Sequence, residues 1–133
     1  RLAQSLVERD ADNTDWQRVL AVSHACVGTV YRLQGRLAEA LEAYDAGLGI
    51  MRLLVVRDPD NAGWQRDLSA LHNNIGGVCW AQGRLAQALE AYEADLLVVE
   101  HLVAIDPSNA ECQDHLRGCR QCVDALRKGM SGD

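Results

Sequence analysis

The segment Trp16-Gln17-Arg18 recurs as Trp64-Gln65-Arg66, and Gly35-Arg36-Leu37-Ala38 recurs as Gly83-Arg84-Leu85-Ala86, in both cases 48 positions further along the chain. When residues 10–57 are laid over residues 58–105, 24 of the 48 aligned positions are identical. A third copy begins at Asp106-Pro107-Ser108-Asn109, which matches Asp58-Pro59-Asp60-Asn61. A fixed period of this size indicates a repeat array, in which each unit buries its apolar face against its neighbours.

The bulk composition excludes several classes of protein. The 133 residues are 48% hydrophobic, lack phenylalanine and carry a formal net charge of -6. That charge argues against nucleic acid as a partner, which requires clustered Lys and Arg. No apolar run approaches the roughly 18 residues of a membrane span. The 5 cysteines, an odd number at irregular spacing, do not form a secreted disulfide framework, so we expect a cytoplasmic protein. From the charge and the apolar runs, we expect that it binds neither nucleic acid nor membrane.

Proline and glycine divide each repeat into two helices. The only prolines, Pro59 and Pro107, lie at repeat boundaries beside Asp and Asn residues that can cap a following helix. Gly35 and Gly83 lie halfway, where a left-handed residue closes a helix. Between these residues the apolar positions step by three and four, as on one face of a helix. We therefore predict helices near 13–33, 37–57, 61–81, 85–105 and 109–128.

The predicted units are two full repeats with a partial unit at each end. Residues 1–9 align with the end of the second helix of a repeat, so we interpret them as the tail of a preceding repeat. Repeats then cover 10–57 and 58–105, and 106–128 forms a C-terminal capping helix. In that helix Arg120, Asp124 and Arg127 occupy positions that pack on a second helix in the other units. Residues 129–133 are expected to be a flexible tail.

The repeated residues resemble the tetratricopeptide repeat (TPR). That family has a large residue, Leu-Gly and Tyr in the first helix, a glycine turn, Ala and an aromatic residue in the second helix, and Asp-Pro between units. This chain has, in order, His24, Val27-Gly28, Tyr31, Gly35, Ala40, Tyr44 and Asp58-Pro59, and in the next copy His72, Ile75-Gly76, Cys79, Gly83, Ala88, Tyr92 and Asp106-Pro107. The resemblance covers essentially the whole chain and implies an all-α, right-handed solenoid of helical hairpins.

The repeat of this chain is longer than the 34 residues usual in that family. The surplus divides into about seven residues for each helix, which is about two turns, so the added segments keep the same face inward. We therefore interpret the chain as a variant with a 48-residue period and lengthened helices.

The resemblance also implies a binding surface, because in the family the first helices line a concave groove that holds a peptide. By position, one unit contributes Thr29 and Arg32, the next contributes Asn73, Asn74, Gly77 and Trp80, and the capping helix contributes Gln121. The second set breaks the repeat, since Asn73-Asn74 replaces Ala25-Cys26 and Trp80 replaces Arg32. The asparagine amides could hold a ligand backbone and Trp80 could be its apolar anchor. The alternative is a solvated face with Trp80 packed on the neighbouring first helix.

Catalytic and metal motifs are weak. The segment Cys112-x-x-His115-x-x-x-Cys119-x-x-Cys122 has zinc-like spacing. However, its first and last residues are ten positions apart, which on one helix is about 15 Å, too far for one tetrahedral ion. Buried thiols are the preferred interpretation, with a Cys119–Cys122 redox pair as the alternative. There is no phosphate loop, nucleophile elbow or zinc-protease motif. We expect no catalytic residue, no metal and no cofactor.

These observations predict a non-catalytic module that binds a peptide or protein segment in the groove. The alternative is a rigid spacer or self-association scaffold for a neighbouring effector domain, with weak self-association through exposed array ends. The resemblance further suggests a piece of a bacterial multidomain protein.

Overall fold

The computed structural model describes residues 14–131, which form five helices and no strand. The helices are α2 (Thr14–Leu33), α3 (Leu37–Arg57), α4 (Ala62–Ala81), α5 (Leu85–Ile105) and α6 (Ala110–Ser131). Every expected helix is present, and each begins within one residue of its expected start. The end of α6 differs from the prediction, because the helix continues to Ser131 and includes residues expected to be a flexible tail. The expected tail of a preceding repeat, residues 1–9, lies outside the described residues.

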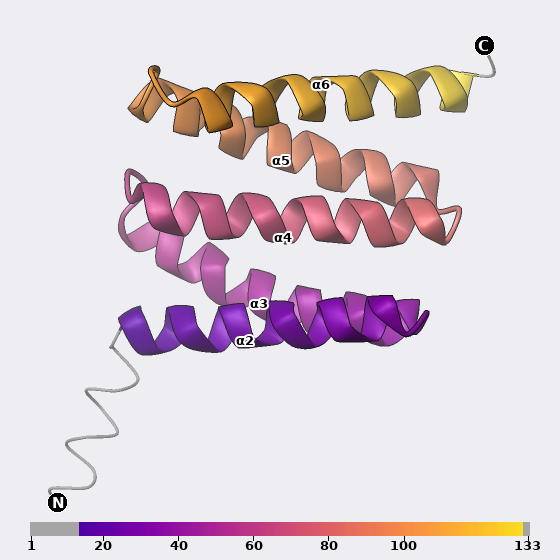
Figure 1. Cartoon of the computed structure of the whole chain (residues 1–133), viewed down its shortest axis with the longest axis horizontal. Helices are drawn as coiled ribbons and strands as arrows, with labels where there is room; N and C mark the ends of the chain where they lie inside the picture. Colours follow the sequence, from indigo (N-terminus) through magenta and orange to yellow (C-terminus); the bar gives the residue numbers. More distant parts are fainter. Residues whose placement is uncertain (1–13, 132–133) are drawn as a thin grey trace, which may run out of the picture.

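The helices form two layers, and each antiparallel hairpin contributes one helix to each layer. In Figure 1, α2, α4 and α6 run side by side in the front layer, and α3 and α5 cross behind them. The hairpins α2–α3 and α4–α5 are the two repeats, and α3 and α5 each pack against the first helix of the next unit. The all-α stack of hairpins, and with it the TPR-like fold, is therefore confirmed, while a right-handed superhelical path stays a prediction.

Each hairpin turns at a glycine in the left-handed conformation. Gly35 and Gly83 have φ of 77° and 76°, and no other described residue has positive φ. In both turns a backbone N–H reaches back five residues, from Arg36 to the Tyr31 carbonyl and from Arg84 to the Cys79 carbonyl, each at 2.9 Å. These bonds satisfy carbonyl groups that the helix end leaves unpaired. The two identical turns give the two hairpins the same geometry.

The boundary between units is fixed by asparagine caps. The Asn61 side chain accepts a hydrogen bond from the Trp64 backbone N–H at 3.1 Å, and Asn109 accepts one from Cys112 at 3.2 Å. Such caps satisfy N–H groups at the start of a helix. The recurring glutamine has a related role, because Gln65 donates to the Pro59 carbonyl oxygen at 2.6 Å. Part of the Trp-Gln-Arg motif thus serves the repeat boundary.

Within each hairpin, a tyrosine of the second helix packs directly on a glycine of the first. A Cβ atom at Gly28 would lie 2.8 Å from ring carbons of Tyr44, and one at Gly76 would lie 2.8 Å from a ring carbon of Tyr92. Carbon atoms do not approach so closely without displacement, so only glycine lets the tyrosine ring lie against the helix backbone. Tyr44 and Tyr92 are 0% and 6% exposed, and this contact sets the spacing of each helix pair.

The first helix of each unit presents one apolar stripe toward the preceding unit. In α6 this stripe is completely covered and consists of Cys112, Leu116, Cys119, Val123 and Leu126. The charged residues Arg120, Asp124 and Arg127 of α6 are exposed, as expected. In α2 the counterpart positions Trp16, Leu20, Val27 and Val30, here called the α2 stripe, are 42–56% exposed.

The glycine–tyrosine contact yields a stability prediction. Gly76→Ala should lower the free energy of unfolding by about 1–3 kcal/mol, because the added methyl group displaces Tyr92. Gly118→Ala is the matched control, since no atom lies within 4 Å of a Cβ there. It should raise stability by about 0.5–1 kcal/mol through helix propensity. Urea denaturation followed by circular dichroism measures both, and equal effects of the two substitutions would contradict the contact.

Candidate functional site

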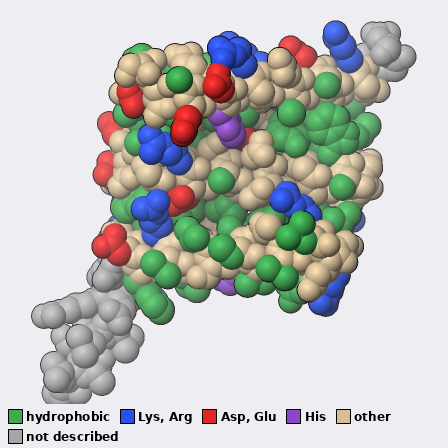
Figure 2. Space-filling model, viewed as in Figure 1, with side chains coloured by type: hydrophobic (Ala, Val, Ile, Leu, Met, Phe, Trp, Pro, Cys, Tyr) green, Lys and Arg blue, Asp and Glu red, His purple; other side chains and the backbone are tan. Residues whose placement is uncertain are grey.

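The front face of the molecule is formed by one stripe from each of α2, α4 and α6. On α4 this stripe, here called the α4 stripe, consists of Arg66, Ala70, Asn73, Gly77 and Trp80, spaced by three and four residues. Two hollows lie on either side of Ala70, with volumes of about 150 Å³ toward α2 and about 200 Å³ toward α6. Figure 2 shows apolar side chains between the rows of this face. The front face is therefore furrowed between its helices.

The predicted groove residues are not equally available for a ligand. Thr29 is already bonded, because its hydroxyl lies 2.8 Å from the Tyr44 hydroxyl and donates to the Ala25 carbonyl at 3.1 Å. Asn73 is directed to a carboxylate of α5, described below. Arg32 and Gln121 are exposed at the two ends of the face.

Asn74, Gly77 and Trp80 remain open to a ligand. Asn74 is half-buried and forms no hydrogen bond with another described side chain. Trp80 is 39% exposed, and its ring meets Tyr92 edge-on with centroids 6.0 Å apart. A Cβ at Gly77 would be 3.7 Å from the Tyr92 hydroxyl oxygen, an ordinary contact, so this glycine is not required by packing. The contact with Tyr92, within the same hairpin, holds an exposed indole face in place.

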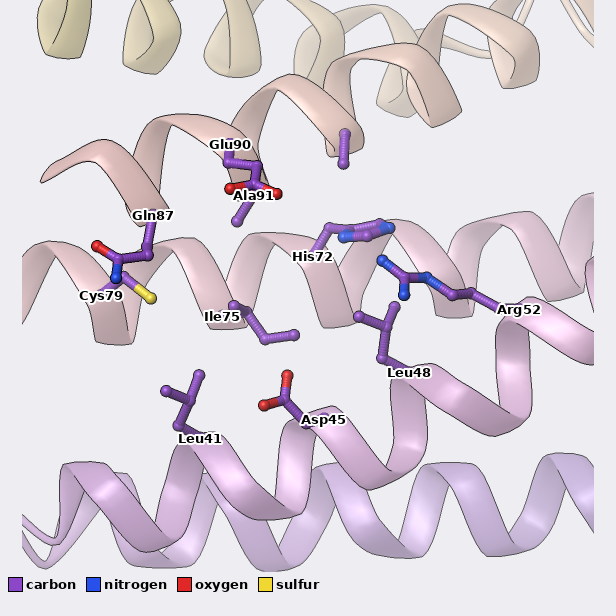
Figure 3. Close-up of a pocket in the computed structure, with 11 residues that line it drawn as sticks. Leu41, Asp45, Leu48, Arg52, His72, Ile75, Cys79, Gln87, Glu90 and Ala91 are labelled. Atoms are coloured by element: carbon purple, nitrogen blue, oxygen red, sulfur yellow. The ribbon is translucent and has the colours of Figure 1, made fainter. Parts of the chain in front are cut away.

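A second candidate site is a cavity between α3 and α5, with α4 as its floor (Figure 3), here called the rear pocket. Its volume is about 270 Å³. Polar side chains on its walls include Asp45 and Arg52 from α3 and Glu90 from α5, and His72 rises from the floor. Asp45 and Glu90, which come from different hairpins, thus line one shared pocket.

The charges of the rear pocket act on His72. Burial lowers the pKa of His72, Arg52 lowers it further, and Asp95 opposes them. Burial also raises the pKa of Asp45, with Arg52 acting in the opposite direction. His72 is 6% exposed and forms no hydrogen bond with a described residue. The pocket therefore holds an uncharged imidazole near neutral pH.

A third site is a polar cluster inside the molecule, between α4, α5 and α6. Its centre is Asp95, which is 0% exposed. Ser69 donates a hydrogen bond to Asp95 Oδ1 at 2.5 Å. The other carboxylate oxygen lies 3.0 Å from His115 Nε2, 3.1 Å from Cys119 Sγ and 3.4 Å from Asn73 Nδ2. These residues are called the Asp95 cluster.

Hydrogen bonding keeps the centre of this cluster ionised. Burial alone would raise the pKa of Asp95, but hydrogen bonds from His115, Ser69 and Cys119 outweigh it and lower that pKa. The same bond raises the pKa of His115. Burial, followed by the nearby carboxylate, raises the pKa of Cys119, and burial raises that of Cys122. Both thiols therefore stay protonated, which argues against the alternative of a Cys119–Cys122 redox pair.

The Asp95 cluster is not a catalytic triad, although it contains Ser, His and Asp. In a triad the serine and the aspartate bond to opposite ring nitrogens of the histidine. Here Ser69 Oγ, at 3.2 Å, and Asp95 both face the same nitrogen, Nε2 of His115. Ser69 also gives its own proton to Asp95. The hydroxyl is consequently not activated as a nucleophile.

Sequence reasoning overlooked Asp95, although a signal was present. Asp95 occupies the position of Gly47 in the preceding repeat, and Ser69 and Asn73 occupy those of Ala21 and Ala25. The test that singled out Asn73 and Trp80, a departure from the repeat, would have identified the whole cluster. The zinc-like motif on α6 was judged on one helix alone, and that view left out the carboxylate of α5.

Comparisons with known proteins do not identify a function for this chain. No known protein family matches the chain, and no curated protein matches it. Among solved structures, the chain is similar to the first TPR domain of the human RPAP3 protein, determined by NMR, with 17% sequence identity. The match covers 84% of this chain and 98% of that domain at a TM-score of 0.26. That score is too low for the likeness to carry any conclusion about function. None of the described helices is long and apolar enough to cross a membrane.

The rear pocket predicts a pH dependence. The folded state resists protonation of His72, because its pKa lies below the 6.5 of an unperturbed histidine. The unfolded chain therefore binds more protons below about pH 6.5, and His72 destabilises the fold as the pH falls. In His72→Gln this loss should be absent, so the stability of the wild type relative to the variant should decline from about pH 7.5 to about pH 5. Parallel pH profiles in urea denaturation would contradict this assignment.

Proposed function

We propose that this chain is a non-catalytic protein-interaction module that binds a peptide segment across its front face, with Trp80 as the apolar anchor. The observation that carries the proposal is the local departure from the repeat at Asn74, Gly77 and Trp80. Neither the helix caps nor the hairpin contact requires these residues. Gly77 in a helix costs about 1 kcal/mol of propensity relative to alanine, and its contacts do not compensate for that cost.

The geometry of the α4 stripe suits a peptide better than a small molecule. The hollows beside Ala70 are shallow and separate, each smaller than the roughly 300 Å³ at which small-molecule pockets begin. An exposed aromatic ring fixed by Tyr92 can bury an apolar side chain at low entropic cost. The Asn74 amide can donate to and accept from a peptide backbone. The 5 cysteines are all free thiols, which suits the reducing cytoplasm that forms part of this proposal.

The test uses peptides selected from a displayed library and labelled for fluorescence anisotropy. Two substitutions, Asn74→Ala and Trp80→Arg, should each weaken binding about tenfold or more, as expected for hot-spot residues. The second one restores the residue of the first repeat. Leu97→Ala is the control, because Leu97 is 70% exposed on α5, outside the front face. If the peptides bind the wild type and all three variants equally, the front face is not the binding site.

A second candidate function, self-association, is favoured by the α2 stripe. Its counterparts in α6 are at most 8% exposed, so this surface has the composition of a buried interface between units. Another unit of the same repeat would bury this stripe if it packed on α2 as the hairpin α2–α3 packs on α4. A solvent-exposed stripe of this kind is otherwise unfavourable.

Light scattering over a concentration series tests this candidate. If the α2 stripe mediates self-association, the mass should rise with concentration, and Leu20→Glu with Val27→Glu should abolish the rise. Leu97→Glu, on an exposed surface of α5, should leave it unchanged. A mass that stays monomeric at all concentrations would exclude the self-association scaffold.

A further inference from the structure

The Asp95 cluster is a local replacement within an otherwise repeated architecture. At the first interface the corresponding residues are Gly47, Ala21 and Ala25 from the hairpin α2–α3, and Leu71 and Asp67 from α4. A Cβ at Gly47 would lie 2.9 Å from the Ala21 carbonyl oxygen and 3.3 Å from Leu71. The first interface is thus closed by small and apolar groups in direct contact.

The fold does not require a polar cluster at the second interface, because the same helix arrangement exists without one. A buried carboxylate costs several kcal/mol of desolvation, which its partners must offset. Asp67, the counterpart of His115, instead forms an ion pair with Arg18 at 2.6 Å, where both are accessible. At the second interface the corresponding residue is His115, whose side chain turns inward and contacts Asp95. Five coordinated departures at one place indicate a function beyond packing.

The side chains of Asp95, His115 and Cys119 are typical metal ligands. His115 and Cys119 are four residues apart on α6, the spacing that places two ligands on one helix face. Asp95 comes from α5 and completes a carboxylate, imidazole and thiol set. One ligand atom from each lies within 4.8 Å of the other two. Cys112 and Cys122 are not members of this set, which agrees with the rejection of a four-residue site along a single helix.

Two of the three distances between the ligand atoms are slightly shorter than those at a tetrahedral zinc ion, and the third lies within 4.8 Å. Bonds of about 2.0–2.3 Å at tetrahedral angles place neighbouring ligand atoms about 3.3–3.6 Å apart. Asp95 Oδ2 is 3.0 Å from His115 Nε2 and 3.1 Å from Cys119 Sγ. A lengthening of a few tenths of an ångström brings these two distances into the range of a coordination site.

We propose that Asp95, His115 and Cys119 bind a Zn²⁺ ion, with the fourth coordination position open toward the front face. The hollow between α4 and α6 is lined by both Ser69 and His115, so a water or a ligand atom can reach the ion from there. Thiolate together with imidazole favours zinc over magnesium or calcium, which prefer oxygen ligands.

Charge and proton balance support this assignment. Binding releases the proton of the Cys119 thiol and any proton on His115 Nε2, because only the deprotonated groups coordinate. The two charges of the ion are then balanced by the Asp95 carboxylate and the Cys119 thiolate. A neutral centre replaces the buried pair of Asp95 and His115. No electron transfer is involved, so the site needs no oxidant or reductant.

The experiment titrates the chelator-treated protein with Zn²⁺ by calorimetry and with Co²⁺ by absorption. We expect one ion per chain, a rise in melting temperature that a chelator reverses, and with Co²⁺ a near-ultraviolet sulfur-to-metal band. Cys119→Ala and Asp95→Asn should each weaken binding by more than the about 10–100-fold typical of lost outer partners. Cys122→Ser is the control, because this thiol lies on the same helix outside the ligand set and should leave binding unchanged.

A variant that copies the first interface guards against loss of folding. Ser69→Ala, Asp95→Gly and Cys119→Leu together install the residues found there, so the protein should keep its helical content and lose the metal. Absence of stoichiometric Zn²⁺ binding by the wild type would overturn the proposal. Equal binding by the wild type and this triple variant, or a Co²⁺ spectrum that persists in Cys119→Ala, would also overturn it.

Discussion

The contact of a tyrosine ring with a helical glycine is the constraint on which the hairpins depend. Tyr44 on Gly28 and Tyr92 on Gly76 bring two long helices together at a point where any side chain would hold them apart. Both tyrosines are buried, and the glycine turns return each second helix to the same place. Because the contact recurs with the period, the two units have the same shape and can stack by one rule.

Equal shape does not imply equal interiors. The first interface between units is closed by apolar side chains and a glycine backbone, whereas the second contains a buried carboxylate with four polar neighbours. The stacking rule is satisfied in both cases, so the chain has freedom to change chemistry at one interface without losing its architecture. The altered interface opens beside the α4 stripe, so the proposed metal site adjoins the proposed peptide-binding face.

The fold could be predicted from sequence because its signals are local and repeated. Pro59, Gly83 and Asn61 mark boundaries through backbone chemistry that acts within a few residues, and the structure has its helices where they indicate. The buried stripe of α6 was likewise predictable from the spacing of apolar residues along one helix. The end of α6 was missed, because residues 129–133 were expected to be a flexible tail, whereas the helix continues to Ser131.

The candidate sites were less predictable, because they depend on side chains that meet across helices. Asp95 and His115 belong to different units, and nothing along either helix shows that they lie within hydrogen-bonding distance. Asn73 was assigned to ligand binding because its position on the first helix was predictable, whereas its hydrogen bond to Asp95 was not. The rear pocket combines α3, α4 and α5 in the same way. Departures from the period locate such positions, and only the structure shows which of them meet.

The most direct measurement of the central claim is a proton NMR experiment on the two hairpin contacts. Nuclear Overhauser effects should join the Gly28 Hα protons to the Tyr44 ring and the Gly76 Hα protons to the Tyr92 ring. In each glycine, the Hα proton that lies in the direction of a Cβ atom should also be displaced upfield by the ring current. Ordinary glycine shifts without cross-peaks to either tyrosine would show that the helices are not held by this contact, and would contradict the account.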